Sequence, residues 1–466
     1  MFRKSTHIHF MGIGGIGMSA IAKILLLQGY TISGCDSNMD QKSIFDLQKL
    51  GCTIHPRNNH DLCNDPTITT LVYTSDINIK TAELVRAQEK GIATISRGQM
   101  LAELTRTKYT VAIAGSHGKT TTTSLVAHIF MESKMDPTVL VGGHLTSISS
   151  NAHLGKSSFL VTETDESDRS LLYLFPTLAI LTNIDREHLN TYKNLQDITE
   201  TFQSFLQKIP FYGKAIVCVD DAQIRSLLPL HNIPTTTYGS HPDAQWSYTN
   251  LNLYADYSTY TLLYTKKVMG EVIVPIAGLH NVLNSIAALA VSIEAGISFQ
   301  IASQALATFK GVDRRFTFRG TVQGAELFDD YGHHPTEIAC TALVARKRAR
   351  NKLIVVFQPH RYSRTQTLWK EFVELLATHP ADHLIVTDLY TAHEQEIPGI
   401  SSKELISAAK KINPLAPITH VALDENFASL HKAVTSLATN NDLILLQGAG
   451  NVTKLSHFLL DNPNLK

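Results

Sequence analysis

Short apolar runs alternate with amphipathic stretches along the chain, which is typical of parallel strands joined by helices. In the first part, strands are predicted at residues 7–11 and 30–34, with a helix at 18–28 between them. Further strands are predicted at 71–74 and 93–95. This succession of strand, helix and strand favours a parallel sheet.

A second series of apolar runs begins near residue 110. Residues 248–264 alternate between apolar and polar, which predicts an antiparallel excursion, and the Ala-rich segment 281–295 predicts a buried helix. The other strands of this series are expected at 110–114, 159–162, 178–181 and 215–219.

The last third repeats the pattern, with strands predicted at 353–358, 383–387 and 442–446. A chain of 466 residues corresponds to about three domains at roughly 150 residues each. We therefore expect an α/β fold with three domains. Their predicted limits are 1–107, 108–312 and 313–466.

Composition and charge exclude several classes of protein. Lys and Arg number 41 and Asp and Glu also 41, so the formal net charge is zero, which argues against a nucleic-acid partner. No apolar run approaches the roughly 18 residues of a membrane span, so no membrane insertion is expected. The 5 cysteines include no CxxC pair, which favours reduced thiols and a cytoplasmic location.

A glycine-rich turn with Lys and Thr follows the strand predicted at 110–114. Backbone N–H groups and a helix N-terminus would face phosphates, Lys119 would add a positive charge, and Thr120 could reach Mg²⁺. The full phosphate-loop pattern places Gly where Ile113 stands, so this is a shortened form. The expected nucleotide contacts are Gly115, Ser116, His117, Gly118, Lys119, Thr120 and Thr121.

The first domain carries a second glycine-rich turn, which fits G-x-G-x-x-G between a strand and a helix. Asp36 lies 19 positions beyond Gly17, where a dinucleotide-binding unit places its ribose acceptor. The same geometry can hold any nucleotide diphosphate. The residues of this site are Gly12, Gly14, Gly15, Ile16, Gly17 and Asp36.

An acidic stretch, 163–168, follows the strand predicted at 159–162, and His188 lies beyond the next strand. Because the carboxyl ends of parallel strands line one crevice, these groups should lie near the phosphate loop. Oxygen ligands suit Mg²⁺, so carboxylates of this acidic stretch could coordinate the ion beside substrate phosphates.

Two polar clusters in the last third could also carry chemistry. Residues 329–335 read Asp-Asp-Tyr-Gly-His-His-Pro, and residues 357–364 include Arg361 and Arg364, which are three apart and can converge on one anion. His333-His334 has no obvious partner set for zinc in the sequence.

Together these motifs resemble the Mur ligase family. The resemblance rests on the turn 115–120 and the stretches 163–168 and 182–188. It spans nearly the whole chain, with the motifs in the same order. Within the family, the members that join L-alanine to UDP-N-acetylmuramate are resembled in the opening Gly-Ile-Gly-Gly-Ile-Gly, the segments 329–335 and 357–364, and the third glycine-rich turn 447–451.

The resemblance implies a Rossmann-like first domain for the UDP-sugar, a central ATPase-like domain with a parallel or mixed sheet, and a Rossmann-like third domain. It also implies ATP-dependent formation of an amide through an acyl phosphate. ATP and Mg²⁺ would be the cofactors, and UDP-N-acetylmuramate and L-alanine the partners. We expect a monomer or a weak homodimer.

Residue roles also follow from the resemblance. Lys119 would bind phosphates, Thr120 a first Mg²⁺, and Glu163 with His188 a second Mg²⁺. Glu166 would be a second-shell or alternative ligand. The ATP contacts would include His280, Asn281, Asn284, Arg314 and Asp330. The sugar-lactate, phosphate or amino acid would be met by His333, His360, Arg361 and Arg364. Arg169 stands where the family usually has Ala.

Three other interpretations remain open at this point. An NAD-dependent oxidoreductase would account for Gly12–Gly17 and Asp36 but not for Lys119. A recycling ligase of the same family would join a preformed peptide to the UDP-sugar. A nucleotide-binding protein without catalysis would use the loops alone.

Overall fold

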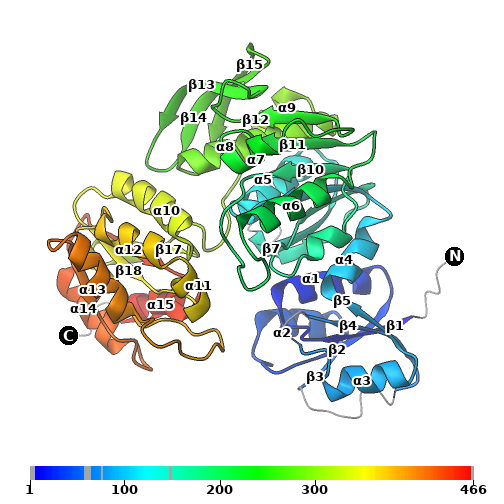
Figure 1. Ribbon diagram of the computed structural model, residues 1–466, viewed down its shortest axis with the longest axis horizontal. Helices are drawn as coiled ribbons and strands as arrows, with labels where there is room; N and C mark the ends of the chain where they lie inside the picture. The colour runs from blue at the N-terminus through cyan, green and yellow to red at the C-terminus, as the bar shows by residue number, and fades with distance from the viewer. Residues whose placement is uncertain (1–5, 57–64, 75–76, 146–149, 463–466) are drawn as a thin grey trace.

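The computed structural model describes residues 6–56, 65–74, 77–145 and 150–462. Within these residues the strands form three sheets with helices against their faces, each in its own lobe (Figure 1). The first and central lobes lie together, and the third lies to one side of them (Figure 1). The predicted three-part α/β fold is confirmed.

The first sheet is parallel throughout, in the order β3-β2-β1-β4-β5. Its strands are β1 (His7–Met11), β2 (Thr31–Asp36), β3 (Thr53–Pro56), β4 (Ile68–Tyr73) and β5 (Ala93–Ser96). The helices are α1 (Ile16–Leu27), α2 (Lys42–Lys49), α3 (Ala82–Glu89) and α4 (Arg97–Thr105). Because β1 lies at the centre, the turn that follows it sits at the middle of the carboxyl edge, where ligands bind in such sheets.

The central sheet has the order β15-β14-β13-β12-β11-β10-β6-β9-β7-β8. It is parallel from β13 to β7 and antiparallel at both ends. Its middle strands are β6 (Tyr109–Ala114), β9 (Phe159–Glu163), β10 (Leu178–Leu181), β11 (Lys214–Cys218) and β12 (Thr235–Tyr238). The outer strands are β7 (Thr138–Leu145), β8 (Ser150–His153), β13 (Trp246–Leu253), β14 (Ser258–Tyr264) and β15 (Lys267–Val274).

Buried helices fix this sheet in place. Residues 286–291 of α8 are completely buried, as the Ala-rich sequence predicts, because small side chains allow close packing. The helices are α5 (Lys119–Glu132), α6 (Leu195–Leu206), α7 (Ala222–Ser226), α8 (Leu279–Glu294) and α9 (Phe299–Leu306).

The third sheet has the order β16-β17-β21-β18-β19-β20, antiparallel only between β16 and β17. The strands are β16 (Thr317–Val322), β17 (Ala325–Asp330), β18 (Leu353–Phe357), β19 (His383–Val386), β20 (Ile418–His420) and β21 (Leu443–Gln447). The helices are α10 (Pro335–Arg348), α11 (Tyr362–Thr367), α12 (Trp369–Ala377), α13 (Ser402–Ile412), α14 (Ala428–Leu437) and α15 (Lys454–Asp461).

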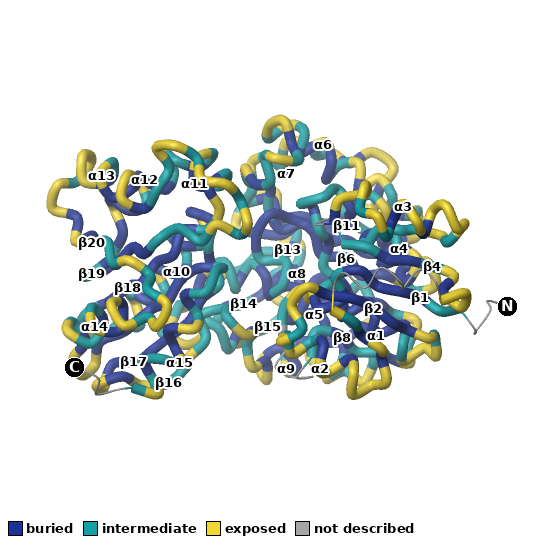
Figure 2. The backbone as a smooth tube through the Cα atoms, turned by 90° about the horizontal axis from the view of Figure 1, so that it is seen from below, coloured by how far each residue is buried: buried dark blue, intermediate teal, exposed yellow. Residues whose placement is uncertain are grey.

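The apolar cores show how the lobes are joined. One continuous core runs through the first and central lobes, whereas the third lobe has cores of its own. The buried segments accordingly follow the sheets, and exposed residues lie on loops and outer helix faces (Figure 2). The third lobe meets the central lobe through polar contacts such as Arg186–Glu371, Arg364–Glu187 and His117–Glu337. Polar contacts of this kind favour relative movement of domains.

Two expectations from composition can be compared with the structure. Among the described residues, Cys35, Cys52, Cys218 and Cys340 are not joined in disulfides, and Cys63 lies outside the described residues. Among the described helices, none combines the length and the apolar character that crossing a bilayer requires.

Candidate functional site

The turn between β6 and α5 has the backbone geometry of a phosphate loop. Gly118 precedes α5 with φ +81°, and no side chain caps the helix N-terminus. Gly115 has φ +130°, and a Cβ there would lie 2.1 Å from Thr182 Oγ1. The helix therefore begins with its N–H groups available for an anion.

Lys119 is folded back over this loop. Its Nζ donates to Gly115 O at 2.6 Å and Ser116 O at 2.9 Å, and it pairs with Glu166 Oε1 at 2.8 Å. Burial alone would lower the pKa of Lys119, but the charge of Glu166 raises it, so the ammonium stays protonated. The loop thus holds a permanent positive charge at the helix N-terminus.

Glu163 ends β9 and faces the first turn of α5. Its Oε2 accepts a hydrogen bond from Thr120 Oγ1 at 2.8 Å. A Cβ on Gly142 of β7 would lie 1.9 Å from Glu163 Oε1, so glycine leaves the space that this carboxylate fills. Burial raises the pKa of Glu163, because the charged carboxylate is poorly solvated there. A cation beside Glu163 would stabilise the charged form. A hydroxyl and a carboxylate are ligands that suit Mg²⁺.

His188 lies in a second group of possible ligands. Its Nε2 is 3.3 Å from Glu166 Oε1 and 3.5 Å from Glu187 Oε2. Ligand atoms of these three residues all lie within 4.8 Å of one another, and Glu166 Oε2 is buried without a hydrogen-bond partner among the described residues. This unsatisfied oxygen fits a cation site. The contacts place Glu163 beside Thr120, and His188 beside Glu166 and Glu187, a residue that the sequence did not single out.

A cavity of about 1150 Å³ opens between the central and third lobes, next to the phosphate loop. Among the predicted nucleotide residues, His117, Gly118, Thr121, His280, Asn281, Asn284 and Asp330 line it. Phe316 and Tyr238 also line the cavity, so its wall holds both aromatic and polar groups. Its size and its start at the loop fit a nucleotide.

Arg314 and its neighbour differ in what they face. Arg314 Nη2 donates to Gly448 O at 2.7 Å, and its Nε is 3.4 Å from Asp329 Oδ2. Arg315, which the sequence did not single out, lines the cavity. The two adjacent arginines in the sequence indicated a nucleotide contact, but the sequence alone could not decide which of them faces the cavity.

Asp330 is buried and His280 is half-buried in the wall of this cavity. Asp330 accepts hydrogen bonds from the backbone N–H groups of Phe316 and Gly332, both at 2.9 Å, and burial raises its pKa. Burial, reinforced by the charge of Arg315, lowers the pKa of His280 to about 4. His280 is therefore neutral at pH 7.

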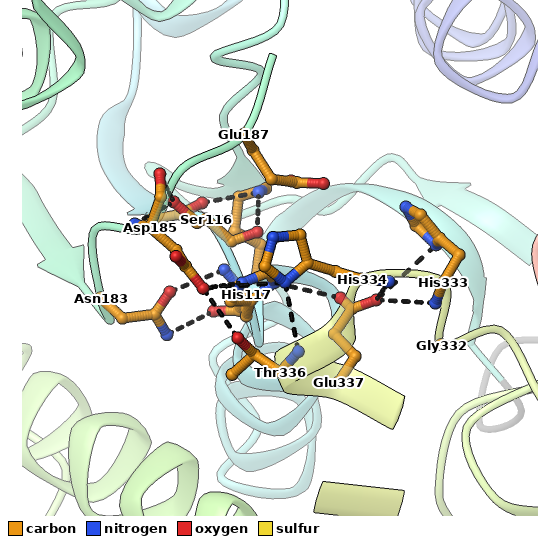
Figure 3. A network of polar contacts seen from close by, with 12 residues as sticks. Ser116, His117, Asn183, Asp185, Glu187, Gly332, His333, His334, Thr336 and Glu337 are labelled. Atoms are coloured by element: carbon orange, nitrogen blue, oxygen red, sulfur yellow. Dashed lines mark hydrogen bonds and ion pairs between the residues drawn. The ribbon is translucent and has the colours of Figure 1, made fainter. Parts of the chain in front are cut away.

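The ring of His117 lies where the central and third lobes meet (Figure 3). Its Nε2 is 3.0 Å from Asp185 Oδ2, and its Nδ1 is 3.3 Å from Glu337 Oε1. The pattern of the loop predicted His117 as a nucleotide contact, but it gave no sign of Asp185 or Glu337.

The first glycine-rich turn joins β1 to α1. Asp36 Oδ2 accepts the N–H of Gly14 at 2.8 Å, and Asp36 Oδ1 accepts the N–H of Asn38 at 2.9 Å. Asp36 thus holds the turn in shape. Gly15 and Ile16 are exposed at the start of α1, and Gly17 lies beside the Arg97 side chain. No side chain caps the N-terminus of α1, and a helix start of this kind suits a diphosphate.

Three of the polar residues of the third lobe converge. Arg364 lies 3.0 Å from His360 Nδ1 through Nη1, and 3.4 Å from Glu187 Oε1 through Nη2. The rings of His333 and His360 have centroids 5.7 Å apart. Burial lowers the pKa of His333 to about 4 and that of His360 to about 3. Arg361, in contrast, is half exposed with its Nη1 4.0 Å from Glu394 Oε1.

Arg169 is held within the central lobe. Its Nη2 lies 2.5 Å from Asp197 Oδ2 of α6, and its guanidinium stacks on the ring of Tyr192. Tyr192 OH in turn donates to Glu166 O at 2.6 Å. Through Tyr192, Arg169 therefore helps to hold the acidic stretch 163–168 in position.

Three family models match the chain in succession. "Mur ligase family, catalytic domain" matches residues 7–109, "Mur ligase middle domain" matches 113–292, and "Mur ligase, glutamate ligase domain" matches 314–450.

Whole proteins match over nearly the full length. The UDP-N-acetylmuramate–L-alanine ligase of Geotalea daltonii is 42% identical, covering 99% of both chains, and that of Syntrophus aciditrophicus is 41% identical, covering 99% of this chain and 94% of the relative. The crystal structure of UDP-N-acetylmuramate-alanine ligase MurC from Thermotoga maritima superposes with a TM-score of 0.78 at 25% identity, covering 98% of each chain. The MurF ligase from Thermotoga maritima, solved in complex with ADP, has a TM-score of 0.64 at 17% identity, covering 99% of this chain and 98% of its own, and shows the fold alone.

Proposed function

This chain belongs to the Mur ligase family, and from that premise we propose that it joins L-alanine to UDP-N-acetylmuramate at the expense of ATP. The products are UDP-N-acetylmuramoyl-L-alanine, ADP and phosphate. The observation that carries the proposal is that relatives named for this reaction are 40–43% identical over 97–99% of the chain.

The proposed reaction has two steps. The lactyl carboxylate attacks the γ-phosphate of ATP, which gives an acyl phosphate and ADP. The amine of L-alanine then attacks the acyl carbon, and the tetrahedral intermediate expels phosphate. Lys119 would exchange Glu166 for phosphate oxygens, because both are anions within reach of the same Nζ.

Mg²⁺ fits the oxygen ligands at Thr120 and Glu163 and the group formed by Glu166, Glu187 and His188. When bound, it supplies positive charge that lets a carboxylate approach a phosphate. Lys119 would also supply positive charge there, and its hydrogen bond to Gly115 O holds it in place before ATP arrives.

The remaining substrate contacts also belong to this proposal. The turn at residues 12–17 would hold the UDP diphosphate, and Asp36 would keep that turn in shape. His333, His360 and Arg364 would meet the sugar-lactate or the amino acid, with Arg361 at the rim. We assign domain limits at about residues 107 and 312, a monomer or weak homodimer, and a cytoplasmic location.

The decisive experiment measures phosphate release from ATP with Mg²⁺, UDP-N-acetylmuramate and a panel of L-amino acids and short peptides. Release that requires both the UDP-sugar and L-alanine is the expected result. Release with a tripeptide but not with alanine would identify a recycling ligase instead. Absence of any acceptor-dependent release, together with NADH binding by fluorescence, would favour the oxidoreductase.

A further inference from the structure

The phosphate loop is connected to the third lobe through the side chain of His117. The backbone of His117 is fixed within the central lobe, because its N–H donates to Asn183 Oδ1 at 2.8 Å and its carbonyl accepts from Thr182 Oγ1 at 2.7 Å. Its ring then reaches out to Glu337 of α10, at 3.3 Å (Figure 3). The His117 side chain therefore links α10 directly to the phosphate loop.

The first turn of α10 makes further contacts at the same point. Thr336 Oγ1 donates to Asp185 Oδ2 at 2.8 Å, and that oxygen is also 3.0 Å from His117 Nε2. The His334 ring packs against the His117 ring at an angle of 45°, with centroids 4.5 Å apart. His117 and Asp185 together form the surface on which the start of α10 rests.

Glu337 is held ready for this contact by its own helix. Its Oε2 accepts the backbone N–H of His333 at 3.1 Å and of His334 at 3.4 Å, which forms the capping box of α10. The second oxygen, Oε1, faces His117. The same carboxylate therefore fixes the helix start and joins it to the loop.

His117, Asp185 and His334 could alternatively hold a metal ion, since their ligand atoms lie within 4.8 Å. However, each nitrogen of His117 faces a carboxylate. Burial would lower the pKa of His117, but these two hydrogen bonds raise it to about 10. Because both ring nitrogens are already paired with carboxylates, the group is a charge-paired contact.

We propose that Glu337 is a positioning residue that docks the third domain onto the phosphate loop through His117, so that nucleotide binding and domain docking are coupled. The nucleotide cavity is lined from both lobes, with His117 and Glu337 both on its wall. A docked third domain would therefore complete the nucleotide site. Only the identification of the nucleotide as ATP rests on the proposed function.

The test compares E337Q, H117N and the double variant in the full chain. Gln keeps an oxygen for the capping box but removes the charge that faces His117. We expect E337Q to weaken the affinity for a non-hydrolysable fluorescent ATP analogue by about 5–10-fold. E337Q should add little in the H117N background, because the contact is already lost. The affinity for UDP-N-acetylmuramate should change less than 2-fold.

Glu374→Gln, at an exposed position of α12, is the matched control and should bind the analogue as the unmodified chain does. Should E337Q fail to fold, Thr336→Val removes the hydrogen bond to Asp185 and should weaken analogue binding in the same direction. Unchanged or tighter binding by E337Q, or strictly additive effects in the double variant, would overturn the proposal. The analogue is titrated without UDP-sugar or amino acid, so a failure of the ligase proposal would not be mistaken for a failure of this one.

Discussion

Lys119 and Glu166 form an ion pair, Nζ to Oε1 at 2.8 Å, at the centre of the phosphate loop. The same carboxylate oxygen is 3.3 Å from His188 Nε2. Glu166 thus occupies the place beside Lys119 that a phosphate oxygen would take. The ion pair keeps a buried cation satisfied before the nucleotide arrives.

Lys119→Ala should therefore remove activity almost entirely. It deletes the cation expected at the transferred phosphate and removes the lysine partner of the buried Glu166. We expect acceptor-dependent phosphate release to fall by about 10²–10³-fold or more. Lys214→Ala, which breaks the ion pair with Glu294 at the start of β11, is the control and should keep the rate within about 2-fold. Retention of a tenth of the activity by Lys119→Ala would contradict this role.

The roles of Glu163 and Glu166 can be distinguished by how phosphate release by their variants depends on the Mg²⁺ concentration. Because Glu163 faces the Thr120 hydroxyl, Glu163→Gln should raise the Mg²⁺ concentration for half-maximal phosphate release by about 10-fold or more. Glu166→Gln should act mainly on the rate, through Lys119 and His188. Titrating Mg²⁺ at saturating ATP measures both. The opposite order of effects would assign the principal metal contact to Glu166.

Asp36→Asn should weaken nucleotide binding at the turn 12–17 and leave binding at the phosphate loop 115–120 unchanged. The Asp36 carboxylate accepts the N–H groups of Gly14 and Asn38, and charged acceptors make stronger bonds than an amide. We expect UDP binding, measured by calorimetry, to weaken by about 10-fold, which corresponds to one charged hydrogen bond. Asp40→Asn, at an exposed position just after β2, is the control. Equal affinity of all three chains would mean that Asp36 does not shape the turn.

The sequence predicted the architecture because fully buried parallel strands appear as continuous apolar runs. The segments β1, β10 and β18 were found within a residue of their limits. Edge strands such as β3 and β8 were not predicted, since they are short and only half buried, and their side chains do not alternate strongly.

Within the site, residues of one local motif were predictable and contacts across lobes were not. Lys119 and Thr120 follow from the loop pattern alone. The pairs His117–Glu337 and Arg364–Glu187 join residues 220 and 177 positions apart, which no local pattern can relate. Likewise, only the fold decides that Arg315 rather than Arg314 faces the cavity.

Acidification should destabilise the third lobe through His379. This ring is buried after α12, where Nδ1 accepts the N–H of Ala381 at 3.2 Å, and burial lowers its pKa to about 4. An unfolded chain would bind the proton near pH 6.5, whereas the folded one resists it. The neutral ring therefore stabilises the fold fully above pH 6.5, and that contribution is lost as the pH falls towards 4.

The loss amounts to at most about 3 kcal/mol of unfolding free energy. His379→Asn keeps an acceptor near Ala381 but does not titrate, so its stability should fall less between pH 7 and pH 4.5 than that of the unmodified chain. Urea unfolding at several pH values measures the difference. His393→Asn, at an exposed position, should leave the pH dependence unchanged. Parallel pH profiles for His379→Asn and the unmodified chain would show that this ring is protonated as easily in the folded state as in the unfolded one.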